Sequence, residues 1–243
     1  MIHFLADLHL SSETPAITRL FTNYLEEEAR TAEHVFILGD LFEAWPGDDQ
    51  LEDPEDAFAA NIARDLRRLC ERGTRVSIQR GNRDFLLGKR FAEVSGTDLL
   101  PDPYALSLDS AHFVLSHGDA LCTDDTDYQA FRQQVRSSDW QDSLLQKPLT
   151  ERKAIAASMR QQSETFQREN RHPPTDLNPS ATENLLRHHR YATLIHGHTH
   201  CPAEHEHIVD GIRVERWVLS DWRPERGEYL AWDGHRLMRH EVL

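Results

Sequence analysis

The sequence predicts an α/β fold that finishes in a β-rich segment, giving two packed sheets with helices on the outside. Three observations support this prediction. Short apolar runs alternate with amphipathic segments through residues 1–120, residues 121–190 show helical periodicity, and strand-like runs flank two Asp-Gly pairs in residues 203–243. At 243 residues the chain can bury one sizeable core. We therefore expect a single domain over residues 1–243, with residues 121–190 as a helical insertion within it.

Five apolar runs have the length of buried strands. Each is followed by Asp, Asn or His, which are residue types that bind metals. The runs are Ile2–Ala6, Val35–Leu38, Arg75–Gln79, His112–Leu115 and the run whose end includes Leu194-Ile195. Because α/β folds place their chemistry at the carboxyl ends of strands, we expect the side chains after these runs to form one site.

Helices are expected between the first strands because capping residues and proline precede stretches of helical periodicity. Thr14-Pro15 offers a cap followed by proline in the first turn. The apolar face of this helix would hold Ile17, Leu20, Phe21, Tyr24 and Leu25. Asp53-Pro54 predicts the start of a second helix, which Gly73 would end. Its apolar face would hold Phe58, Ile62, Leu66 and Leu69.

Residues 121–190 are longer than a crossover between parallel strands requires. Apolar residues at helical spacing, and a start signal at Asn178-Pro179, predict several helices there. Residues 126–190 hold ten Lys and Arg against eight Asp and Glu, and the rest of the chain is acidic. Long insertions beside an active site often act as lids, and we expect this one to cap the site.

The carboxyl-terminal part carries two hairpin signals. Asp210-Gly211 precedes the strand-like run Ile212–Leu219, and Asp233-Gly234 follows the run Tyr229–Trp232. An Asp-Gly pair between such runs is typical of a tight β-turn. We expect residues 203–243 to form one antiparallel β-meander.

The composition excludes several classes of protein. No run approaches the roughly 18 apolar residues that span a bilayer, and the amino terminus lacks the basic segment of a signal peptide. Three cysteines without Cys-x-x-Cys spacing favour a cytosolic protein without disulfides. The net charge of −14 argues against nucleic acid as a partner.

The residues after the five apolar runs predict a centre for two metal ions. Their carboxylate, amide oxygen and imidazole groups suit Mn²⁺, Fe²⁺, Zn²⁺ or Mg²⁺. Seven ligands are too many for one ion and fit two ions that share a bridge. The seven are Asp7, His9, Asp40, Asn82, His117, His198 and His200.

Asp40 is the candidate for the bridging ligand because it follows the second strand, which we expect to be central. A water held between two ions would be acidified and placed for in-line attack on phosphorus. Each motif alone is a weak signal, since Asp7-x-His9 recurs by chance and Gly39-Asp40 is often a turn. Their occurrence together, each after an apolar run, favours a hydrolytic two-metal site.

Five motifs resemble, in order and spacing, the signature of calcineurin-like metallophosphoesterases. They are Asp7-x-His9, Gly39-Asp40, Gly81-Asn82-Arg83-Asp84, Ser116-His117-Gly118-Asp119 and Gly197-His198-x-His200. The resemblance implies a four-layer αββα sandwich with a helical cap. It also implies that one ion is held by Asp7, His9, Asp40 and His200, and the other by Asp40, Asn82, His117 and His198.

Four longer runs resemble the UDP-2,3-diacylglucosamine hydrolases of the lipid A pathway. They are Ala6–Leu10, Gly39–Asp49, Gly81–Phe85 and His117–Asp125, the last with its continuation Tyr128–Arg132. This resemblance implies attack of a metal-activated water on the α-phosphorus, which releases UMP and 2,3-diacylglucosamine 1-phosphate (lipid X), with Mn²⁺ as cofactor. It further implies a cytoplasmic protein that is peripheral on the inner membrane and whose insertion holds the acyl chains. No obligate protein partner is evident in the sequence.

By the same resemblance, the catalytic residues would be Asp40, Asn82, Arg83 and His117. Contacts to the substrate would come from Asn82, Arg83, Asp125, Ser163 and His198. The chain departs from the family pattern in the insertion, where Gln167 and Asn170 stand at positions that usually hold Asn and Lys. Two alternatives stay open. One is a soluble phosphodiesterase or nucleotide pyrophosphatase with the same metal site, and the other is a scaffold that keeps the fold without the chemistry.

Overall fold

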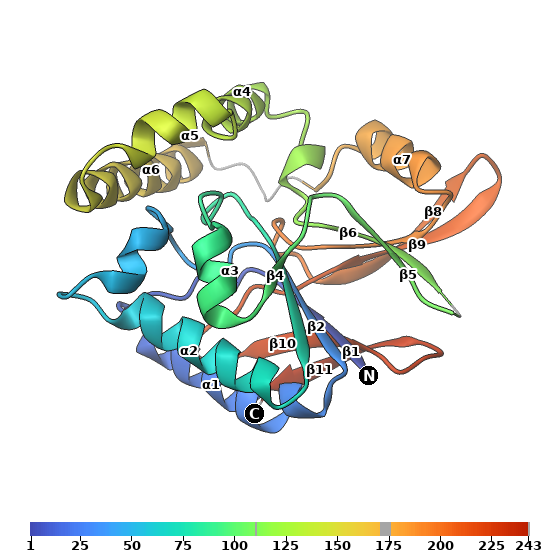
Figure 1. Ribbon diagram of the computed structural model, residues 1–243. Coiled ribbons are helices and arrows are strands. Elements are labelled where there is room, and N and C mark those ends of the chain that lie inside the picture. Colours follow the sequence, from blue (N-terminus) through green and yellow to red (C-terminus); the bar gives the residue numbers. More distant parts are fainter. Residues whose placement is uncertain (110, 171–175, 243) are drawn as a thin grey trace.

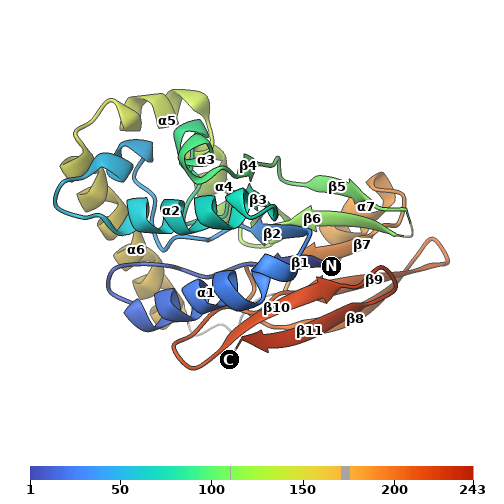
Figure 2. The same cartoon turned by 60° about the horizontal axis from the view of Figure 1, so that its bottom comes forward.

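The computed structural model describes residues 1–109, 111–170 and 176–242, and within α6 (Leu149–Asn170) it describes side chains only as far as Gln161. Two β-sheets lie face to face, with helices against their outer faces (Figures 1 and 2). A further group of helices sits at one end of the sandwich (Figure 1). None of the helices in these ranges is both long and apolar enough to cross a membrane.

The first sheet joins the amino-terminal strands to the last two strands of the chain, in the order β11-β10-β1-β2-β3-β4. Strands β1 to β4 pair in parallel, whereas β10 pairs antiparallel with both β1 and β11. The bounds are β1 Ile2–Leu5, β2 His34–Leu38, β3 Arg75–Gln79, β4 Asp98–Leu99, β10 Gly227–Trp232 and β11 Leu237–Val242. β2 is an interior strand of this sheet, as the sequence predicts.

The second sheet has the order β5-β6-β7-β9-β8. Strands β6, β7 and β9 are parallel, and β5 and β8 pair antiparallel at the two edges. The bounds are β5 Tyr104–Ser107, β6 His112–Ser116, β7 Thr193–His196, β8 Ala203–Val209 and β9 Ile212–Val218. The parallel strands of both sheets therefore end at a common edge, where their loops meet.

The single β-meander expected for residues 203–243 is wrong. The two hairpins form, but β8–β9 belongs to the second sheet and β10–β11 to the first. The chain crosses between them because Trp222 is buried beside α1, with its ring 6.1 Å from that of Phe21 and 5.8 Å from that of Tyr24. The backbone N–H of Trp222 also donates to the carbonyl of Asp7, 3.0 Å away.

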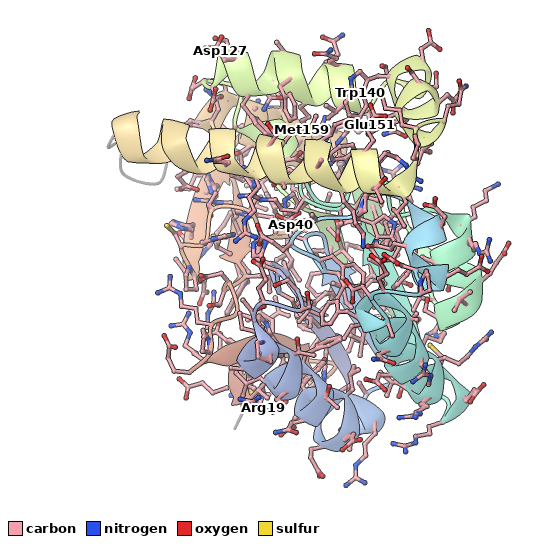
Figure 3. All side chains as sticks on the ribbon, turned by 90° about the vertical axis from the view of Figure 1, so that its left-hand side faces the viewer. Arg19, Asp40, Asp127, Trp140, Glu151 and Met159 are labelled. Atoms are coloured by element: carbon pink, nitrogen blue, oxygen red, sulfur yellow. The ribbon has the colours of Figure 1, made fainter. Side chains whose placement is uncertain are left out.

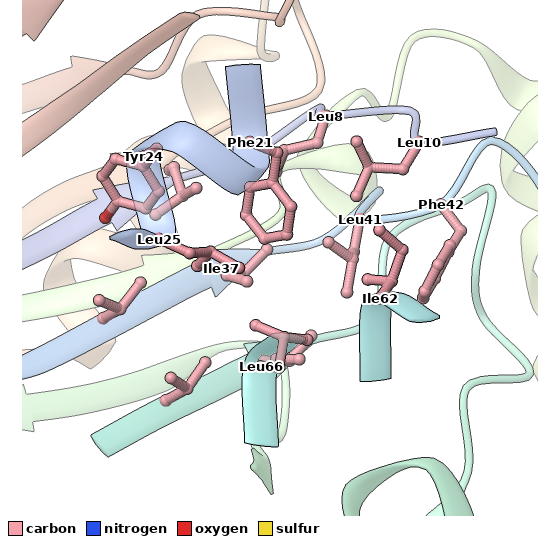
Figure 4. Packing of buried hydrophobic residues seen from close by; sticks show 14 of the residues in the cluster. Leu8, Leu10, Phe21, Tyr24, Leu25, Ile37, Leu41, Phe42, Ile62 and Leu66 are labelled. Carbon is pink, nitrogen blue, oxygen red and sulfur yellow. The ribbon is translucent and has the colours of Figure 1, made fainter. Parts of the chain in front are cut away.

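Three apolar clusters separate the layers and confirm the αββα prediction. The outer face of the first sheet packs against α1 (Pro15–Glu27), α2 (Phe58–Glu71) and α3 (Lys89–Ser95), as Figure 4 shows for Phe21, Ile37 and Leu66. A second cluster, which includes Phe4, fills the space between the sheets. The third lies between the second sheet and α7 (Pro179–His188), where Leu186 is fully buried. The shorter 3₁₀ helices are η1 Ala29–Thr31, η2 Asp48–Glu52 and η3 Asp119–Leu121.

The second helix begins later than predicted. The α-helix α2 starts at Phe58, and the 3₁₀ helix η2 comes before Asp53-Pro54. The carboxylate of Asp53 accepts the N–H of Glu55 at 3.0 Å, and that of Asp56 accepts the N–H of Phe58 at 3.0 Å. These side-chain turns occupy residues for which Asp53-Pro54 predicts the first turn of a helix, so the helix begins only after them.

Residues 121–190 divide into two parts. Helices α4 (Thr126–Val135), α5 (Ser138–Leu145) and α6 lie together at the end of the sandwich, on the side of the ligand loops (Figure 1). We call these three helices the cap. Helix α7, which Asn178 caps by accepting the N–H of Ala181 at 2.9 Å, instead covers the second sheet.

The buried His3 gives the fold a pH dependence that can be tested. Its side chain is 0% exposed, and its Nδ1 lies 3.1 Å from the hydroxyl of Tyr24. Burial lowers the pKa of His3 from 6.5 to about 4, and the positive amino terminus adds to this effect. The unfolded chain therefore binds a proton at His3 below pH 6.5, whereas the folded chain does so only near pH 4.

The contribution of neutral His3 to stability is thus complete above pH 6.5 and is lost as the pH falls toward 4. We expect His3→Phe to reduce the loss of urea resistance between pH 8 and pH 5. His112→Phe, at an exposed position of β6, is the control and should keep the dependence of the unmodified protein. Equal pH dependence in all three proteins would contradict the prediction.

Candidate active site

The seven predicted ligands come together at the edge where the parallel strands of the two sheets end. Asp7 and His9 follow β1, Asp40 follows β2, and the remaining ligands follow β3, β6 and β7. Backbone hydrogen bonds join these loops. In the first sheet, His9 N–H donates to the Asp40 carbonyl at 3.0 Å. Within the second sheet, Gly197 N–H donates to the carbonyl of His117 at 3.0 Å. Nδ1 of His117 lies 2.9 Å from the carbonyl of Leu38 and so joins the two sheets.

Five of the seven residues have left-handed backbone conformations, in which φ is positive. Side chains other than glycine adopt this region at a cost, although Asp, Asn and His tolerate it best. Such strain persists only where the surroundings fix it. The five φ values are Asp7 54°, His9 48°, Asp40 52°, His198 69° and His200 55°.

The glycines before Asn82 and His198 are required by space. A Cβ at Gly81 would lie 2.0 Å from Oδ1 of Asp40, and a Cβ at Gly197 would lie 2.4 Å from Oδ2 of Asp7. Each glycine therefore lets the loop of one strand approach the carboxylate of another. This explains why glycine stands before Asn82 and before His198 in the motifs.

One group of candidate ligands consists of Asp7, His9 and His200. Nε2 of His9 lies 3.4 Å from Nε2 of His200, which in turn lies 3.4 Å from Oδ1 of Asp7. Oδ1 of Asp7 is buried and has no hydrogen-bond partner in the described part of the chain. Its Oδ2 accepts the backbone N–H of His198 at 2.9 Å. Facing imidazole nitrogens beside an unpartnered carboxylate oxygen suit a divalent cation.

The second group consists of Asn82, His117 and His198, and Asp40 lies between the two groups. Oδ1 of Asn82 is 2.9 Å from both Nε2 of His117 and Nδ1 of His198. Nδ1 of His117 bonds the Leu38 carbonyl at 2.9 Å, so Nε2 is the nitrogen that faces the site. Oδ2 of Asp40 is 3.7 Å from His117 Nε2 and 3.9 Å from His9 Nε2, where a bridging ligand would have to be.

The carboxylates give the site a preference for positive charge. Burial by itself lowers the pKa of His117, but the carboxylates of Asp40, Asp7 and Asp119 outweigh it and raise the pKa to about 9. Burial, together with the charge of His117, lowers the pKa of His198 to about 4. The donor set of carboxylates, amide oxygen and imidazole nitrogen fits two divalent ions.

Glu43 is a site residue that the sequence reasoning missed. Its Oε2 lies 3.1 Å from Nδ1 of His9 and would hold the His9 ring with Nε2 facing the site. Its Oε1 lies 3.3 Å from Nε of Arg160 in the cap and 3.7 Å from the Arg83 guanidinium. The only signal for Glu43 is its place in the run after Asp40.

Asp84 ends the motif Gly81-Asn82-Arg83-Asp84, and the sequence predicted no role for it. The side chain is 0% exposed and its oxygens accept four backbone N–H groups from the loops after β2 and β3. The donors are Leu41 at 2.8 Å, Gly81 at 2.7 Å, Asp40 at 3.3 Å and Phe42 at 3.3 Å. Asp84 thus fixes the Asp40 loop relative to the Asn82 loop.

Asp119 connects the site to the cap. Its Oδ2 accepts the hydroxyl of Tyr128 at 2.8 Å and Nε of Arg132 at 2.8 Å, both from α4. The ring of Tyr128 stacks on that of His198, with centroids 5.9 Å apart. Arg136, also near α4, donates to the carbonyl of Gly81 at 3.0 Å. Helix α4 therefore borders the His198 end of the site.

The remaining predicted residues have different surroundings. The backbone N–H of Arg83 donates to Oδ1 of Asp40 at 2.8 Å, so this residue belongs to the site. Asp125 is exposed, and its carboxylate caps α4 by accepting the N–H of Tyr128 at 2.9 Å. The side chains of Ser163, Gln167 and Asn170 lie outside the described residues.

Comparison with known proteins agrees with this geometry. Residues 1–202 match the family described as calcineurin-like phosphoesterase. The UDP-2,3-diacylglucosamine hydrolase of Aromatoleum aromaticum is 47% identical over 231 residues, which are 95% of this chain and 92% of that protein. The chain belongs to the calcineurin-like phosphoesterase family and, within it, to the UDP-2,3-diacylglucosamine hydrolase family.

Two further proteins place the chain in the same way. A UDP-2,3-diacylglucosamine hydrolase of Pseudomonas aeruginosa is 43% identical over 235 residues, 96% of each chain. Among solved structures, a dimetal phosphatase from Danio rerio has a TM-score of 0.54 and 13% identity, covering 99% of this chain and 95% of the other. This likeness shows the fold. The calcineurin-like family depends on two metals, and candidate ligands for both are present here.

The role of the glycines gives a prediction for metal binding. Gly81→Ala is expected to displace Asp40 and to lower the metal retained after dialysis against Mn²⁺. Gly88→Ala is the matched control, because its Cβ would lie 2.4 Å from Oδ2 of Asp48, outside the ligand set. Both variants should lose stability, and only Gly81→Ala should lose metal. Atomic absorption on the folded variants decides between them, and equal retention would contradict the steric argument.

Proposed function

We propose that the chain hydrolyses the pyrophosphate of UDP-2,3-diacylglucosamine to UMP and 2,3-diacylglucosamine 1-phosphate (lipid X), a step of lipid A biosynthesis. The observation that carries this proposal is the pair of ligand groups joined at Asp40. Relatives that are 43–47% identical over at least 95% of the chain have this activity in their names. A scaffold without chemistry would not need seven converging ligands, five of them in strained backbone conformations.

The metal assignment is part of the proposal. One ion would be held by Asp7, His9, Asp40 and His200, and the other by Asp40, Asn82, His117 and His198, with Mn²⁺ as the resident metal. When bound, two such ions supply an acidified water and neutralise phosphate charge. Asp40, Asn82 and His117 would act directly at the reacting phosphate through this centre. The spacing of the two groups around Asp40 supports this arrangement.

Two arginines would add to the charge that offsets the pyrophosphate. Arg83 and Arg160 line a cavity of about 300 Å³ together with His9, His200 and Glu43. Glu43 contacts both guanidinium groups and so holds them beside the candidate metal ligands. Guanidinium groups bind phosphate oxygens with two hydrogen bonds, and their charge stabilises the more negative transition state. The leaving group is a phosphate, which needs little help from a general acid.

The cap would bind the acylated sugar. Figure 3 shows the cap, with Trp140 and Met159, above the part of the molecule that holds Asp40. Leu86, Leu87 and Leu144 are buried in the core, so the acyl chains would contact the less buried apolar residues. These include Phe131, which is 38% exposed, and Leu145, which is 42% exposed. Asp125, Ser163 and His198 would contact the glucosamine.

Because the proposed substrate carries two acyl chains, we place the protein in the cytoplasm and at the cytoplasmic face of the inner membrane as a peripheral protein. The exposed apolar side chains of the cap support this placement. Flotation with vesicles of membrane phospholipid tests it, and absence of any association would remove this part of the proposal.

The proposed reaction predicts the fate of solvent oxygen. Hydrolysis in ¹⁸O-water should place the label in UMP, because attack is expected at the α-phosphorus. Mass spectrometry of both products is the measurement, and preformed UMP incubated with the protein is the control for exchange. Label found only in the acylated sugar phosphate would mean attack at the other phosphorus. If UDP-2,3-diacylglucosamine is not hydrolysed and a CDP-alcohol or a cyclic nucleotide is, the proposed substrate is wrong.

Because Asp40 is the proposed bridge, its substitution should reduce activity more than substitution of a ligand that binds one ion. Asp40→Ala removes a ligand of both proposed ions, whereas His9→Ala removes a ligand of one. Asp40→Ala should therefore cost roughly tenfold or more activity beyond the loss in His9→Ala. Rates on the UDP substrate with excess Mn²⁺ test this, with circular dichroism to check the fold. Similar residual activity in both variants would contradict the assignment of Asp40 as the bridge.

A further inference from the structure

A second cavity lies beside the one that contains Arg83. It has a volume of about 490 Å³ and shares Ser11, Glu43 and Arg160 with the smaller cavity. Its walls come from the segment after β1, the segment after β2, the start of α2, and α6. Volumes of ~300–1,000 Å³ are typical of sites for small molecules. We propose that this cavity, which we call the nucleoside cavity, holds the uridine of the substrate.

The lining of the nucleoside cavity suits a base and a ribose. Gln50 lines it, and Nε2 of Gln50 is buried without a hydrogen-bond partner in the described part of the chain. A carbonyl of a pyrimidine would accept from this amide. Phe58 is half-buried in the wall and offers a face on which a base can stack. The carboxylates of Glu13 and Asp56 can accept the ribose hydroxyls.

The same lining disfavours an acyl chain. Charged groups in the wall include Glu13, Glu43, Asp56, Lys153 and Arg160. An alkyl chain in this cavity would take water from these groups and return no hydrogen bond. The exposed apolar residues Phe131 and Leu145 instead belong to the cap and are absent from the lining of this cavity.

The two ends of the active site give the orientation. The His198 end borders α4, because Tyr128 stacks on His198 and Asp125 begins that helix. His9 lines the smaller cavity, which shares Ser11, Glu43 and Arg160 with the nucleoside cavity. A pyrophosphate across the proposed metals has the glucosamine on one side and the nucleoside on the other. Since the glucosamine is assigned to the α4 end, the nucleoside takes the His9 end. This inference rests on the proposed function.

Helix α6 provides a position at which the nucleoside cavity can be filled. One face of α6 lines it, at the spacing of a helical stripe. Ala156 lies on that face, whereas Ala154 is exposed and does not line the cavity. The residues of the face are Lys153, Ala156, Ala157, Arg160 and Gln161.

The test compares Ala156→Trp with the matched control Ala154→Trp in the full-length, Mn²⁺-loaded protein. Inhibition by UMP, inorganic phosphate and 2,3-diacylglucosamine 1-phosphate is measured for each. Ala156→Trp should weaken inhibition by UMP about tenfold, since the indole fills the space that the base would occupy, and should leave the other two constants unchanged. Ala154→Trp should change none of the three.

Two results would overturn the inference. Weaker inhibition by the acylated sugar phosphate, with UMP unchanged, would assign the cavity to an acyl chain. Three unchanged constants in folded Ala156→Trp would place the nucleoside elsewhere. If Ala156→Trp does not fold, Gln50→Leu is judged by the same criteria, because it removes the unpartnered amide donor.

Failure of the uridine assignment for this cavity can be distinguished from failure of the proposed function. Turnover of UDP-2,3-diacylglucosamine by the unmodified protein tests the function alone. Calorimetric titration of the unmodified protein and both tryptophan variants with UMP, against inorganic phosphate, tests the cavity without turnover. UMP that binds no more tightly than phosphate to the unmodified protein would overturn the inference even if the function stands.

Discussion

The site depends on one constraint: five ligand residues must hold left-handed backbone conformations at the ends of strands from two different sheets. Each such residue costs on the order of 1 kcal/mol or more and would relax in an isolated loop. The loops cannot relax here because they are bonded to one another. His9 N–H is bound by the Asp40 carbonyl, Gly197 N–H by the His117 carbonyl, and four loop N–H groups by Asp84. The two sheets are thus the support that keeps the ligand geometry fixed.

The charge pattern of the chain has a structural counterpart in the contact between α6 and the segment after β2. Three basic residues of α6 pair with acidic residues of that segment: Arg152 with Asp49, Lys153 with Asp53, and Arg160 with Glu43. Arg152 is 3% exposed, so its pair is shielded from water on one side. The non-acidic insertion therefore neutralises part of an acidic body, and the cap is held over the ligand loops by this contact.

The sequence predicts the strands, the ligands and the layers because their signals are local. An apolar run followed by Asp, Asn or His indicates both where a strand ends and which candidate ligand follows it. The roles of Glu43 and Asp84 leave no such signal, since their partners are His9 and the backbone of other loops. The two hairpins were predicted, but an Asp-Gly turn carries no information about which sheet its two strands join. The late start of α2 depends on side-chain turns that compete with the helix.

The sheets and the insertion contribute to different parts of the proposed reaction. The sheets carry the candidate metal ligands, and the insertion shapes the cavities in which a substrate would bind. The candidate metal ligands come from loops at the sheet edge, whereas the cavities beside them are closed by α6 and by the segments after β1 and β2. Substitutions in α6 that leave Arg160 in place can therefore reshape what binds without moving a candidate ligand. Glu43 joins α6 to the ligand loops, since one oxygen faces His9 and the other faces Arg160. A shift of α6 would reach the His9 ring through this carboxylate, just as α4 is joined to the His198 end of the site through Tyr128 and Asp119.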